Sequence, residues 1–248
     1  MRLKGKVAIV TGGGSGFGEG IVKKFVAEGA RVVVADRDGA GARRVAESLG
    51  EAATAVTADV ATEAGFSGAV AQALAKFGGL DILVNNAGVG HTPQPLDTLP
   101  EEVFDRIAAV NMKAIYYGAK LVVPLFKAKK SGAILNIAST GGVSPRPNLT
   151  WYNASKGWVI TATRAMAVEL APFGIRVNAI NPVAGETPLL KTFMGADTPE
   201  VRAKFLSTIP IGRFSTPEDI ANASAFLCSD EASMITGVAM EVDGGRCI

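Results

Sequence analysis

The sequence contains few of the residues that bind metals or form covalent cross-links. Its 248 residues include one histidine and two cysteines, Cys228 and Cys247, which form no Cys-x-x-Cys pair. A zinc enzyme or a disulfide-held scaffold is therefore not expected, and we predict no metal site. Lysine and arginine (25 residues) nearly balance aspartate and glutamate (23 residues). This balance removes the electrostatic attraction that nucleic acid or an anionic membrane surface would require, so neither is expected as a partner.

Long apolar segments are also missing. The first apolar stretch begins at Val7 and is short, and Gly, Lys, Arg or Asn interrupts the longer ones within a few residues. A membrane helix needs about 20 apolar residues, and the first stretch is too short even for the apolar region of a signal peptide. The sequence predicts a cytoplasmic protein.

No linker, composition shift or internal repeat divides the chain, and 48% of its residues are hydrophobic, which fits one domain with a sizeable core. Short β-branched segments alternate with segments of helical periodicity. The alternation predicts strands at 7–11, 31–35, 53–58, 81–84, 133–138 and 175–180, helices at about 100–130 and 152–172, and a final helix and strand within 217–242. Because the strands are continuous apolar blocks, we expect an α/β fold. It is a single-domain, doubly wound parallel sheet of the Rossmann type over residues 1–248, with helices on both faces.

One stretch does not follow this alternation. Between Pro182 and Ser215, prolines and glycines recur and no clean strand is present. Such an irregular insertion is typical of a segment that covers a binding site. We expect residues 186–214 to form a substrate lid that is loose without ligand, because apolar residues such as Leu189 and Phe193 need a surface on which to dock.

A glycine-rich segment, Thr11 to Gly18, separates the first predicted strand from the first helix. Glycines allow the backbone to approach a pyrophosphate closely, and the free N–H groups and positive dipole of the following helix attract phosphate. A glycine-rich turn without a ligand is the alternative. Asp36, at the end of the second strand, favours a dinucleotide, because a carboxylate there can accept hydrogen bonds from both hydroxyls of the adenosine ribose. The alternative for Asp36 is a surface residue that opens a turn.

Tyr152 and Lys156 lie at positions i and i+4 of a predicted helix and therefore share one face. A cation beside a phenol favours the phenolate and lowers a pKa that is ordinarily about 10. Ser139 follows a predicted strand and can emerge at the carboxyl edge of the sheet beside Tyr152. Asn111 lies inside a long predicted helix. Asparagine is a mediocre helix former, so its presence there indicates a local role. Without further context, surface packing is the simpler explanation of the Tyr–Lys pair.

Taken together, these motifs resemble one known family. The sequence carries, in order, TGxxxGxG at 11–18, Asp59–Val60, Asn85-Asn86-Ala87-Gly88, Asn111, Ser139, YxxxK at Tyr152 and Lys156, and Asn181-Pro182. Their order and spacing are similar to those of the short-chain dehydrogenases/reductases, and the match covers essentially the whole chain. The resemblance implies about seven parallel strands, a nicotinamide cofactor, and a catalytic tetrad of Asn111, Ser139, Tyr152 and Lys156.

The resemblance assigns a role to each member of the tetrad. Tyr152 is the general acid/base, and Ser139 polarises the substrate oxygen. Lys156 holds the nicotinamide ribose and lowers the pKa of Tyr152, and Asn111 holds a water molecule in a proton relay. The hydride chemistry itself belongs to the cofactor.

The resemblance also implies a set of cofactor contacts. Asp59 and Val60 resemble the pair that frames adenine, and Asn85 resembles the residue that supports the central strand. The full set is Gly12, Ser15, Gly16, Phe17, Gly18, Asp36, Arg37, Asp59, Val60, Asn86, Ala87, Gly88, Tyr152, Lys156, Pro182, Val183 and Thr187. Val183 departs from the family pattern, in which glycine is usual at this position at the mouth of the substrate pocket.

Two residues favour NAD over NADP as the cofactor. Relatives that use NADP commonly carry a basic residue where this chain has Ser15, and the Asp36 carboxylate would repel a 2'-phosphate. Arg37 is the competing feature, because its guanidinium can pair with a 2'-phosphate or stack on adenine. We predict NAD.

The substrate-pocket candidates form a mostly apolar set: Gly141, Val143, Arg146, Asn148, Trp151, Val183, Ala184 and the stretch from Leu189 to Phe193. A small or medium alcohol or ketone fits this set. Arg146 either binds an anionic group or is a charge on the loop surface. His91 is expected in a solvated loop rather than in the cleft. A basic helix end, Lys127 to Lys130, either docks an acyl carrier protein or complements the helix dipole.

We therefore expect an NAD-dependent oxidoreductase that interconverts a secondary alcohol and a ketone. A 3-oxoacyl-acyl-carrier-protein reductase is the nearest alternative, although Asp36 and Ser15 disfavour the NADPH that this role usually requires. A non-catalytic dinucleotide sensor is the alternative from another class, and it would not need Ser139, Tyr152 and Lys156 together. The resemblance also implies a homotetramer.

Overall fold

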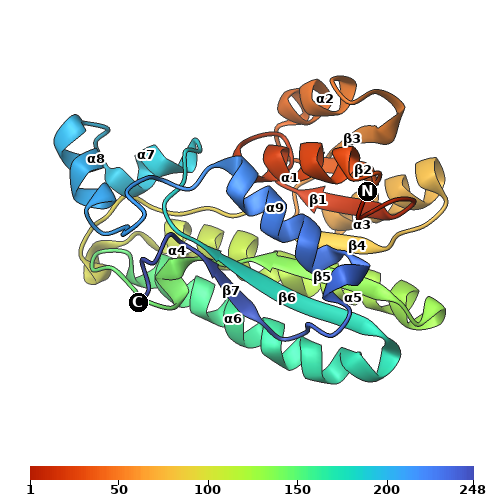
Figure 1. Ribbon diagram of the computed structural model, residues 1–248. Coiled ribbons are helices and arrows are strands. Elements are labelled where there is room, and N and C mark those ends of the chain that lie inside the picture. The colour runs from red at the N-terminus through yellow and green to blue at the C-terminus, as the bar shows by residue number, and fades with distance from the viewer.

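The computed structural model describes residues 1–248 and contains one seven-stranded sheet (Figure 1). The strand order is β3-β2-β1-β4-β5-β6-β7, and all neighbouring strands are parallel. The strands are β1 (Val7–Thr11), β2 (Arg31–Asp36), β3 (Ala53–Thr57), β4 (Ile82–Asn85), β5 (Gly132–Ile137), β6 (Ile175–Pro182) and β7 (Ala239–Val242). The predicted doubly wound parallel sheet is confirmed.

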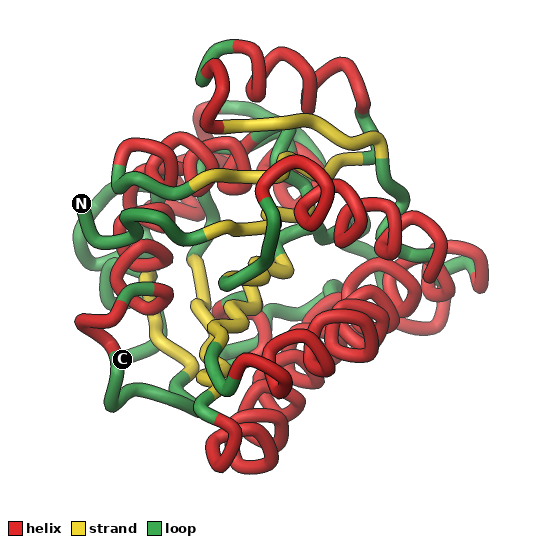
Figure 2. The backbone as a smooth tube through the Cα atoms, turned by 90° about the vertical axis from the view of Figure 1, so that its right-hand side faces the viewer, coloured by secondary structure: helices red, strands yellow, loops and turns green.

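Helices cover both faces of the sheet, as Figure 2 shows. They are α1 (Gly16–Ala27), α2 (Gly39–Glu47), α3 (Glu63–Phe77), α4 (Glu101–Ile107), α5 (Ala114–Lys129), α6 (Thr150–Leu170), α7 (Leu189–Met194), α8 (Pro199–Leu206) and α9 (Pro217–Cys228). Helices α1, α2 and α9 pack in one apolar core, and α3, α5 and α6 pack in another on the opposite face. Alternate residues of β1 supply the two cores, Ala8 and Val10 the first and Val7 and Ile9 the second. This alternation explains why the strand is apolar throughout.

The central strand β1 lies where the direction of winding reverses. It pairs with β2 on one side and with β4 on the other. The connections from β1 and β4 therefore leave toward opposite faces of the sheet, and a crevice opens beyond their carboxyl ends. The glycine-rich segment and the Asn-Asn-Ala-Gly segment both begin at this crevice.

The long helix expected at about 100–130 is interrupted. Helix α4 ends at Ile107, a π-helical turn spans Ala108–Lys113, and α5 continues from Ala114. The widened turn contains Asn111, whose side chain bonds to the backbone of another segment instead of facing solvent. Such turns recur at functional sites.

The segment between β6 and α9 contains no strand, as expected, but it forms two short helices, α7 and α8, that the sequence did not predict. These helices lie outside the two helical layers, at one end of the sheet (Figure 1). An apolar cluster that is separate from the two main cores holds the segment together: Val183, Leu190, Met194, Ile209 and Phe214. No helix of the structure combines the length and apolarity that crossing a membrane requires.

Candidate active site

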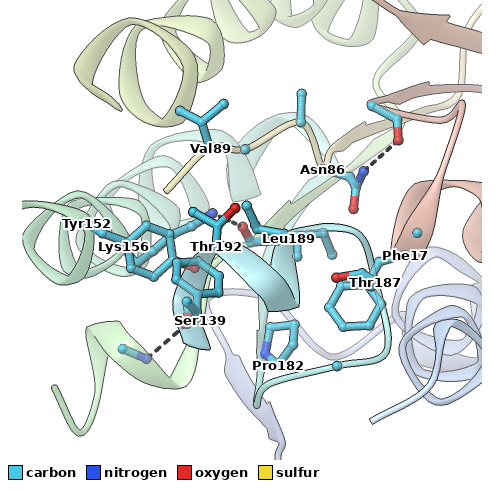
Figure 3. Close-up of a pocket in the computed structure, with 18 of the residues that line it drawn as sticks. Phe17, Asn86, Val89, Ser139, Tyr152, Lys156, Pro182, Thr187, Leu189 and Thr192 are labelled. Atoms are coloured by element: carbon cyan, nitrogen blue, oxygen red, sulfur yellow. Dashed lines mark hydrogen bonds between the residues drawn. The ribbon is translucent and has the colours of Figure 1, made fainter. Parts of the chain in front are cut away.

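A cavity of about 490 Å³ lies at the carboxyl edge of the sheet. Residues that follow β1, β2, β3, β4, β5 and β6 line it, together with residues of α6, α7 and α8. Figure 3 shows Tyr152, Lys156 and Ser139 at one end, with Phe17 and Asn86 toward the other. One continuous cavity therefore joins the glycine-rich segment to the Tyr–Lys pair.

The glycine-rich segment is shaped by positions that exclude other residues. Gly12 and Gly16 have φ angles of +63° and +55°, in the left-handed region that disfavours residues with a Cβ atom. A Cβ at Gly18 would lie 2.0 Å from the carbonyl oxygen of Gly12, so α1 packs directly beneath the segment. The Ser15 side chain does not cap α1, and the first N–H groups of the helix have no partner within it. These donors can bind a pyrophosphate.

Most of the predicted phosphate contacts lie on the cavity wall. Gly12, Ser15, Gly16 and Phe17 line the cavity. Gly18 does not, because its role is to allow the close packing of α1 against the segment.

Asp36 is held in place by backbone groups at the end of β2. Its Oδ2 accepts a hydrogen bond from the Gly14 N–H at 2.9 Å, and its Oδ1 accepts one from the Asp38 N–H at 2.9 Å. A carboxylate has about four lone-pair sites, so two remain for ligand hydroxyls. Asp36 lines the cavity together with Arg37, Asp59 and Val60. This end of the cavity therefore presents a carboxylate with free lone pairs beside a guanidinium.

Asn86 fastens the β4 segment to the β1 segment. Its Nδ2 donates to the carbonyl oxygens of Thr11 and Gly12 at 2.8 and 3.2 Å, and the backbone N–H groups of Asn86 and Ala87 donate to the Thr11 hydroxyl. Asn86, Ala87 and Gly88 consequently line the middle of the cavity.

Asn85 points into the interior of the sheet instead. Its Nδ2 donates to Asn136 Oδ1 at 2.8 Å, which in turn connects to Thr163. Asn85 therefore supports the central strands and lies away from the cavity wall.

Three members of the predicted tetrad meet at the other end of the cavity. Ser139 follows β5, and its Oγ lies close to the Tyr152 ring: a Cβ at Gly141 would lie 3.3 Å from Ser139 Oγ and 3.5 Å from Tyr152 Cε1. Lys156 lies one turn further along α6, with its Nζ 5.9 Å from the centre of the Tyr152 ring and donating to the Ile137 carbonyl at 2.8 Å. Gly141 allows the segment after β5 to lie this close to α6, because a Cβ at Gly141 would lie 2.6 Å from Asn153 Oδ1.

Asn111, the fourth member, lies behind the cavity wall. It is 2% exposed and does not line the cavity. Its Oδ1 accepts from the Val89 N–H at 2.9 Å, and its Nδ2 donates to the Val89 carbonyl and to Ser155 Oγ, both at 3.0 Å. Asn111 thus ties the segment after β4 to α6, next to Lys156.

Burial governs the charge states of the Tyr–Lys pair. It raises the pKa of Tyr152 to about 12, although the neighbouring Ser139 hydroxyl opposes this rise. Burial also lowers the pKa of Lys156 to about 8. The sequence predicted a lowered Tyr152 pKa, and in the protein alone that prediction is wrong. The cost of moving a phenolate out of water exceeds the attraction of an ammonium at this distance.

Replacing Lys156 by Met is expected to change stability in a pH-dependent way. The pKa of Lys156 is about 8 in the cofactor-free folded protein and 10.5 as an ordinary lysine. Between these values the unfolded chain holds a proton that the folded chain has lost, so the free energy of unfolding of the wild type rises with pH. Relative to Lys156→Met, the wild type should gain up to about 3 kcal/mol between pH 7 and pH 10.5. Urea unfolding of both proteins at several pH values measures this, and a constant difference would contradict it.

The structure divides the predicted substrate residues into two groups. The cavity is lined by Gly141, Arg146, Val183, Ala184, Leu189 and Phe193. Val143 and Asn148 are exposed outside it, and Trp151 points away to donate its Nε1 proton to the Leu96 carbonyl. These three assignments to the cavity wall are wrong.

Two further expectations need correction. His91 is 6% exposed, so it is not in a solvated loop; its Nδ1 contacts the Thr92 carbonyl oxygen, and it does not line the cavity. The basic helix end lies at the amino edge of the sheet, just before β5, and the cavity lies at the carboxyl edge. Lys127 lies over the Phe173 ring and Lys129 pairs with Asp81. The helix-dipole interpretation therefore fits these lysines, and docking beside the cavity does not.

The sequence missed several cavity residues. They are Ala58, Val89, Val110, Ile137, Ala138, Thr140, Ser144, Leu149, Asn153, Gly185, Pro188 and Phe205. Several of them adjoin predicted site residues, and that adjacency was the available signal. Phe205 of α8 had no such signal, because it reaches the cavity only through the fold of the lid segment. Phe193 of α7 packs on Tyr152 with ring centres 4.7 Å apart, so α7 covers the Tyr152 side chain.

Known proteins resemble this chain over its full length. A family model described as "Enoyl-(Acyl carrier protein) reductase" matches residues 12–246. The chain is 48% identical over 252 aligned residues to 4-formylbenzenesulfonate dehydrogenase TsaC1/TsaC2 of Comamonas testosteroni, and the alignment covers 100% of both chains.

Solved structures agree with this likeness. A 3-ketoacyl-(acyl-carrier-protein) reductase from Brucella melitensis, complexed with NADH, is 56% identical with a TM-score of 0.95, over 99% of this chain and 100% of that one. A 7α-hydroxysteroid dehydrogenase complexed with NADH and 7-oxo glycochenodeoxycholic acid is 39% identical with a TM-score of 0.92, over 98% and 95%. The chain belongs to the short-chain dehydrogenase/reductase family, whose oxidoreductases use a nicotinamide dinucleotide.

Proposed function

We propose that the protein is an NAD(H)-dependent oxidoreductase that interconverts a secondary alcohol and a ketone, with Tyr152 as the general acid/base. One observation carries the proposal: a single cavity joins the Asp36 carboxylate, which has lone pairs free for ribose hydroxyls, to the neighbouring hydroxyls of Ser139 and Tyr152. A dinucleotide lying along this cavity would bring its nicotinamide ring to the Tyr152 end.

Each residue of the site has a separate task in this reaction. The nicotinamide ring, when bound, supplies or accepts the hydride. During reduction, Tyr152 gives its hydroxyl proton to the carbonyl oxygen, and it takes a proton back from the alcohol during oxidation. The Ser139 hydroxyl holds the same oxygen. Lys156 has donors beyond the one used by Ile137, and these can hold ribose hydroxyls.

Asn111 would act through other residues, because both N–H groups of its amide donate to Val89 and Ser155 and its oxygen accepts from the Val89 N–H. It fixes the position of α6 against the segment after β4. We therefore assign it a positioning role in the proposed site.

The choice of NAD rests on charge at the ribose end. The Asp36 carboxylate would lie beside the adenosine ribose, where a 2'-phosphate would be repelled. Arg37 is exposed and lies at the same end of the cavity. The two solved relatives named above contain NADH, which supports the same choice.

A second candidate function is reduction of a 3-oxoacyl group on an acyl carrier protein. The 56% identical Brucella melitensis structure carries that name, and it contains NADH. The 48% identical relative has a different name, which specifies an aldehyde that bears a sulfonate. Substrate measurements separate these possibilities.

The deciding experiment is a panel of alcohols, ketones and aldehydes, with acetoacetyl-acyl carrier protein included, assayed with NAD(H) and with NADP(H). We expect turnover of small carbonyl compounds with NADH and reverse oxidation of the alcohols with NAD⁺. Preference for acetoacetyl-acyl carrier protein would favour the second candidate. Tight NADH binding without turnover of any member would favour a dinucleotide sensor and overturn the proposal.

We propose that residues 186–214 act as a lid over the substrate. Support comes from the separate apolar cluster of this segment and from the contact of Phe193 with Tyr152. The backbone amides of α7 and α8 should exchange with deuterium faster than those of β1 and β4, and they should slow when NADH and substrate are both bound. Equal protection of all four elements in the free protein would contradict a lid.

We also propose a homotetramer. The outer faces of α5 and α6 expose apolar side chains, with Tyr116 at 55% and Val168 at 80% exposure. Such faces are typical of protein–protein contacts. Size-exclusion chromatography distinguishes a tetramer from a 25.5 kDa monomer.

A further inference from the structure

The charged residues on the cavity wall fall into two groups. Asp36, Arg37 and Asp59 follow β2 and β3 at one end. At the other end the wall has two cations, Arg146 and Lys156, and no aspartate or glutamate. The end of the cavity that would receive the substrate is therefore electropositive.

Arg146 is half-buried and has no acidic partner. None of the ion pairs of the structure includes it. Its Nη2 donates to Thr208 Oγ1 at 2.8 Å, and its Cζ lies 4.4 Å from the centre of the Phe205 ring. A guanidinium carries five N–H donors, so most of the donors of Arg146 are not bonded to protein.

A second arginine lies behind this wall. Arg246 donates from Nη1 to the hydroxyl of Ser144, a cavity residue, at 3.1 Å. Its Nε is buried without a hydrogen-bond partner, and no carboxylate pairs with its guanidinium. Burial lowers the pKa of Arg146, and the positive charge of Arg246 lowers it further, by a smaller amount. Two like charges thus face the same region, and neither forms an ion pair; the Asp243 carboxylate at the same turn is bonded instead to the backbone N–H groups of Gly245 and Cys247.

The surrounding backbone holds both arginines at this place. The Arg146 carbonyl accepts a hydrogen bond from Asn153 Nδ2 at 2.8 Å, which ties it to the residue after Tyr152. The Gly244 carbonyl accepts one from the Ile211 N–H at 3.1 Å, which ties the C-terminal segment to the lid. Three segments that are far apart in the sequence therefore converge beside the cavity. An unpaired, partly buried guanidinium is costly unless an anion offsets it.

We propose that the substrate carries a carboxylate or sulfonate in addition to its reacting carbonyl or alcohol, and that Arg146 binds this anion while the field of Arg246 strengthens the attraction. The inference rests on the proposed oxidoreductase function and names its substrate class. Arg146 also contacts Thr208 and Phe205 of the lid, so an anion bound to it would lie at the junction of lid and cavity. The open fork of the guanidinium suits two oxygens of one anion.

The test uses matched pairs of ketones that differ only in charge. The pairs are 4-acetylbenzenesulfonate with its methyl sulfone analogue, and 4-oxopentanoate and 5-oxohexanoate with their methyl esters, all assayed with NADH. The wild type should prefer at least one anionic member by tenfold or more in kcat/KM. Arg146→Met should reduce kcat/KM for the anion roughly 10 to 150-fold and change the neutral partner less than threefold. Arg146→Lys should recover part of the loss.

Arg202→Met is the matched control. Arg202 lies on α8, pairs with Asp197, and does not line the cavity. Its replacement should leave the ratio of anionic to neutral kcat/KM unchanged. An Arg146→Met variant that loses activity equally on both members of each pair would show that Arg146 only holds the lid, and this would overturn the inference.

A binding measurement keeps the inference separate from the proposed function. Benzenesulfonate and methyl phenyl sulfone are titrated into the NADH-saturated protein by calorimetry, which needs no turnover. Tighter binding of benzenesulfonate that weakens with salt and is lost in Arg146→Met would support the anion site even if no ketone reacts. Equal binding of the two probes, or turnover of neutral ketones without preference for anions, would overturn the anion site and leave the proposed oxidoreductase function intact.

Discussion

Replacing Tyr152 by Phe is expected to lower kcat by about 100 to 10,000-fold, the range typical for loss of a general acid/base. The variant keeps the aromatic ring, so its packing against Phe193 and its position on α6 are preserved. Only the hydroxyl beside Ser139 is removed. NADH binding, followed by its fluorescence, should remain close to that of the wild type. The measurement is single-turnover reduction of the ketone that reacts best with the wild type.

The matched control for this variant is Tyr116→Phe. Tyr116 lies on α5, is 55% exposed and does not line the cavity. Its replacement should leave kcat within a factor of about two, because substitutions at exposed positions have small effects. If Tyr152→Phe retained most of the wild-type rate, the acid/base assignment would fail, and Ser139 would become the next candidate.

The same assignment fixes the direction of the pH dependence. Oxidation of an alcohol requires Tyr152 without its proton, and the pKa of Tyr152 is raised by burial to about 12. The oxidation rate should therefore rise between pH 7 and pH 10, and the reduction rate should not. An oxidation rate that is flat over this range, with the chemical step shown to limit turnover, would count against a phenolate base.

Replacing Asp36 by Asn is expected to lower kcat/KM for NAD about 10 to 150-fold, because a charged hydrogen bond contributes about 1.5 to 3 kcal/mol. Efficiency with NADP should rise, since a 2'-phosphate would no longer face a carboxylate. Asn is preferred to Ala because Gly14 and Asp38 both donate backbone hydrogen bonds to this side chain. An Asn oxygen can retain one of these bonds. The decisive quantity is the ratio of kcat/KM for NAD to that for NADP.

Asp38→Asn provides the control for charge near the same turn. Asp38 is exposed, caps α2 by accepting from the Ala40 N–H at 3.1 Å, and does not line the cavity. Its replacement should leave the NAD to NADP ratio within about twofold. A wild type that prefers NADP, or a ratio that Asp36→Asn leaves unchanged, would reduce Asp36 to a residue that only shapes the turn.

The parallel sheet was predictable because its signal is local. Each strand of the first half is a short apolar block, and Ala8 and Val10 belong to one core while Val7 and Ile9 belong to the other. Strand and helix then alternate in the order that a doubly wound fold requires. The motif residues at strand ends were placed correctly for the same reason, since the carboxyl ends of parallel strands share one edge.

The directions of individual side chains, on α6 and in the loops, were not predictable in this way. Trp151 and Tyr152 are neighbours on α6, yet successive helical residues point about 100° apart, so only Tyr152 faces the cavity. Asn148 has a positive φ of 64°, which turns its side chain in a direction that spacing alone does not indicate. His91 is buried, and Gly90 beside it packs against Phe193 of the lid, a contact between segments about 100 residues apart. These outcomes depend on tertiary contacts.

The placement of β1 at the centre of the sheet has a consequence for folding during synthesis. β1 leaves the ribosome first, but its partner β4 begins only at Ile82. At roughly 5 to 20 residues per second, several seconds separate the two strands. During that interval one edge of β1 has unpaired N–H and C=O groups beside an apolar surface, which is a template for pairing with other chains. Nascent chains arrested before β4 should therefore bind chaperones and should aggregate more readily than longer nascent chains.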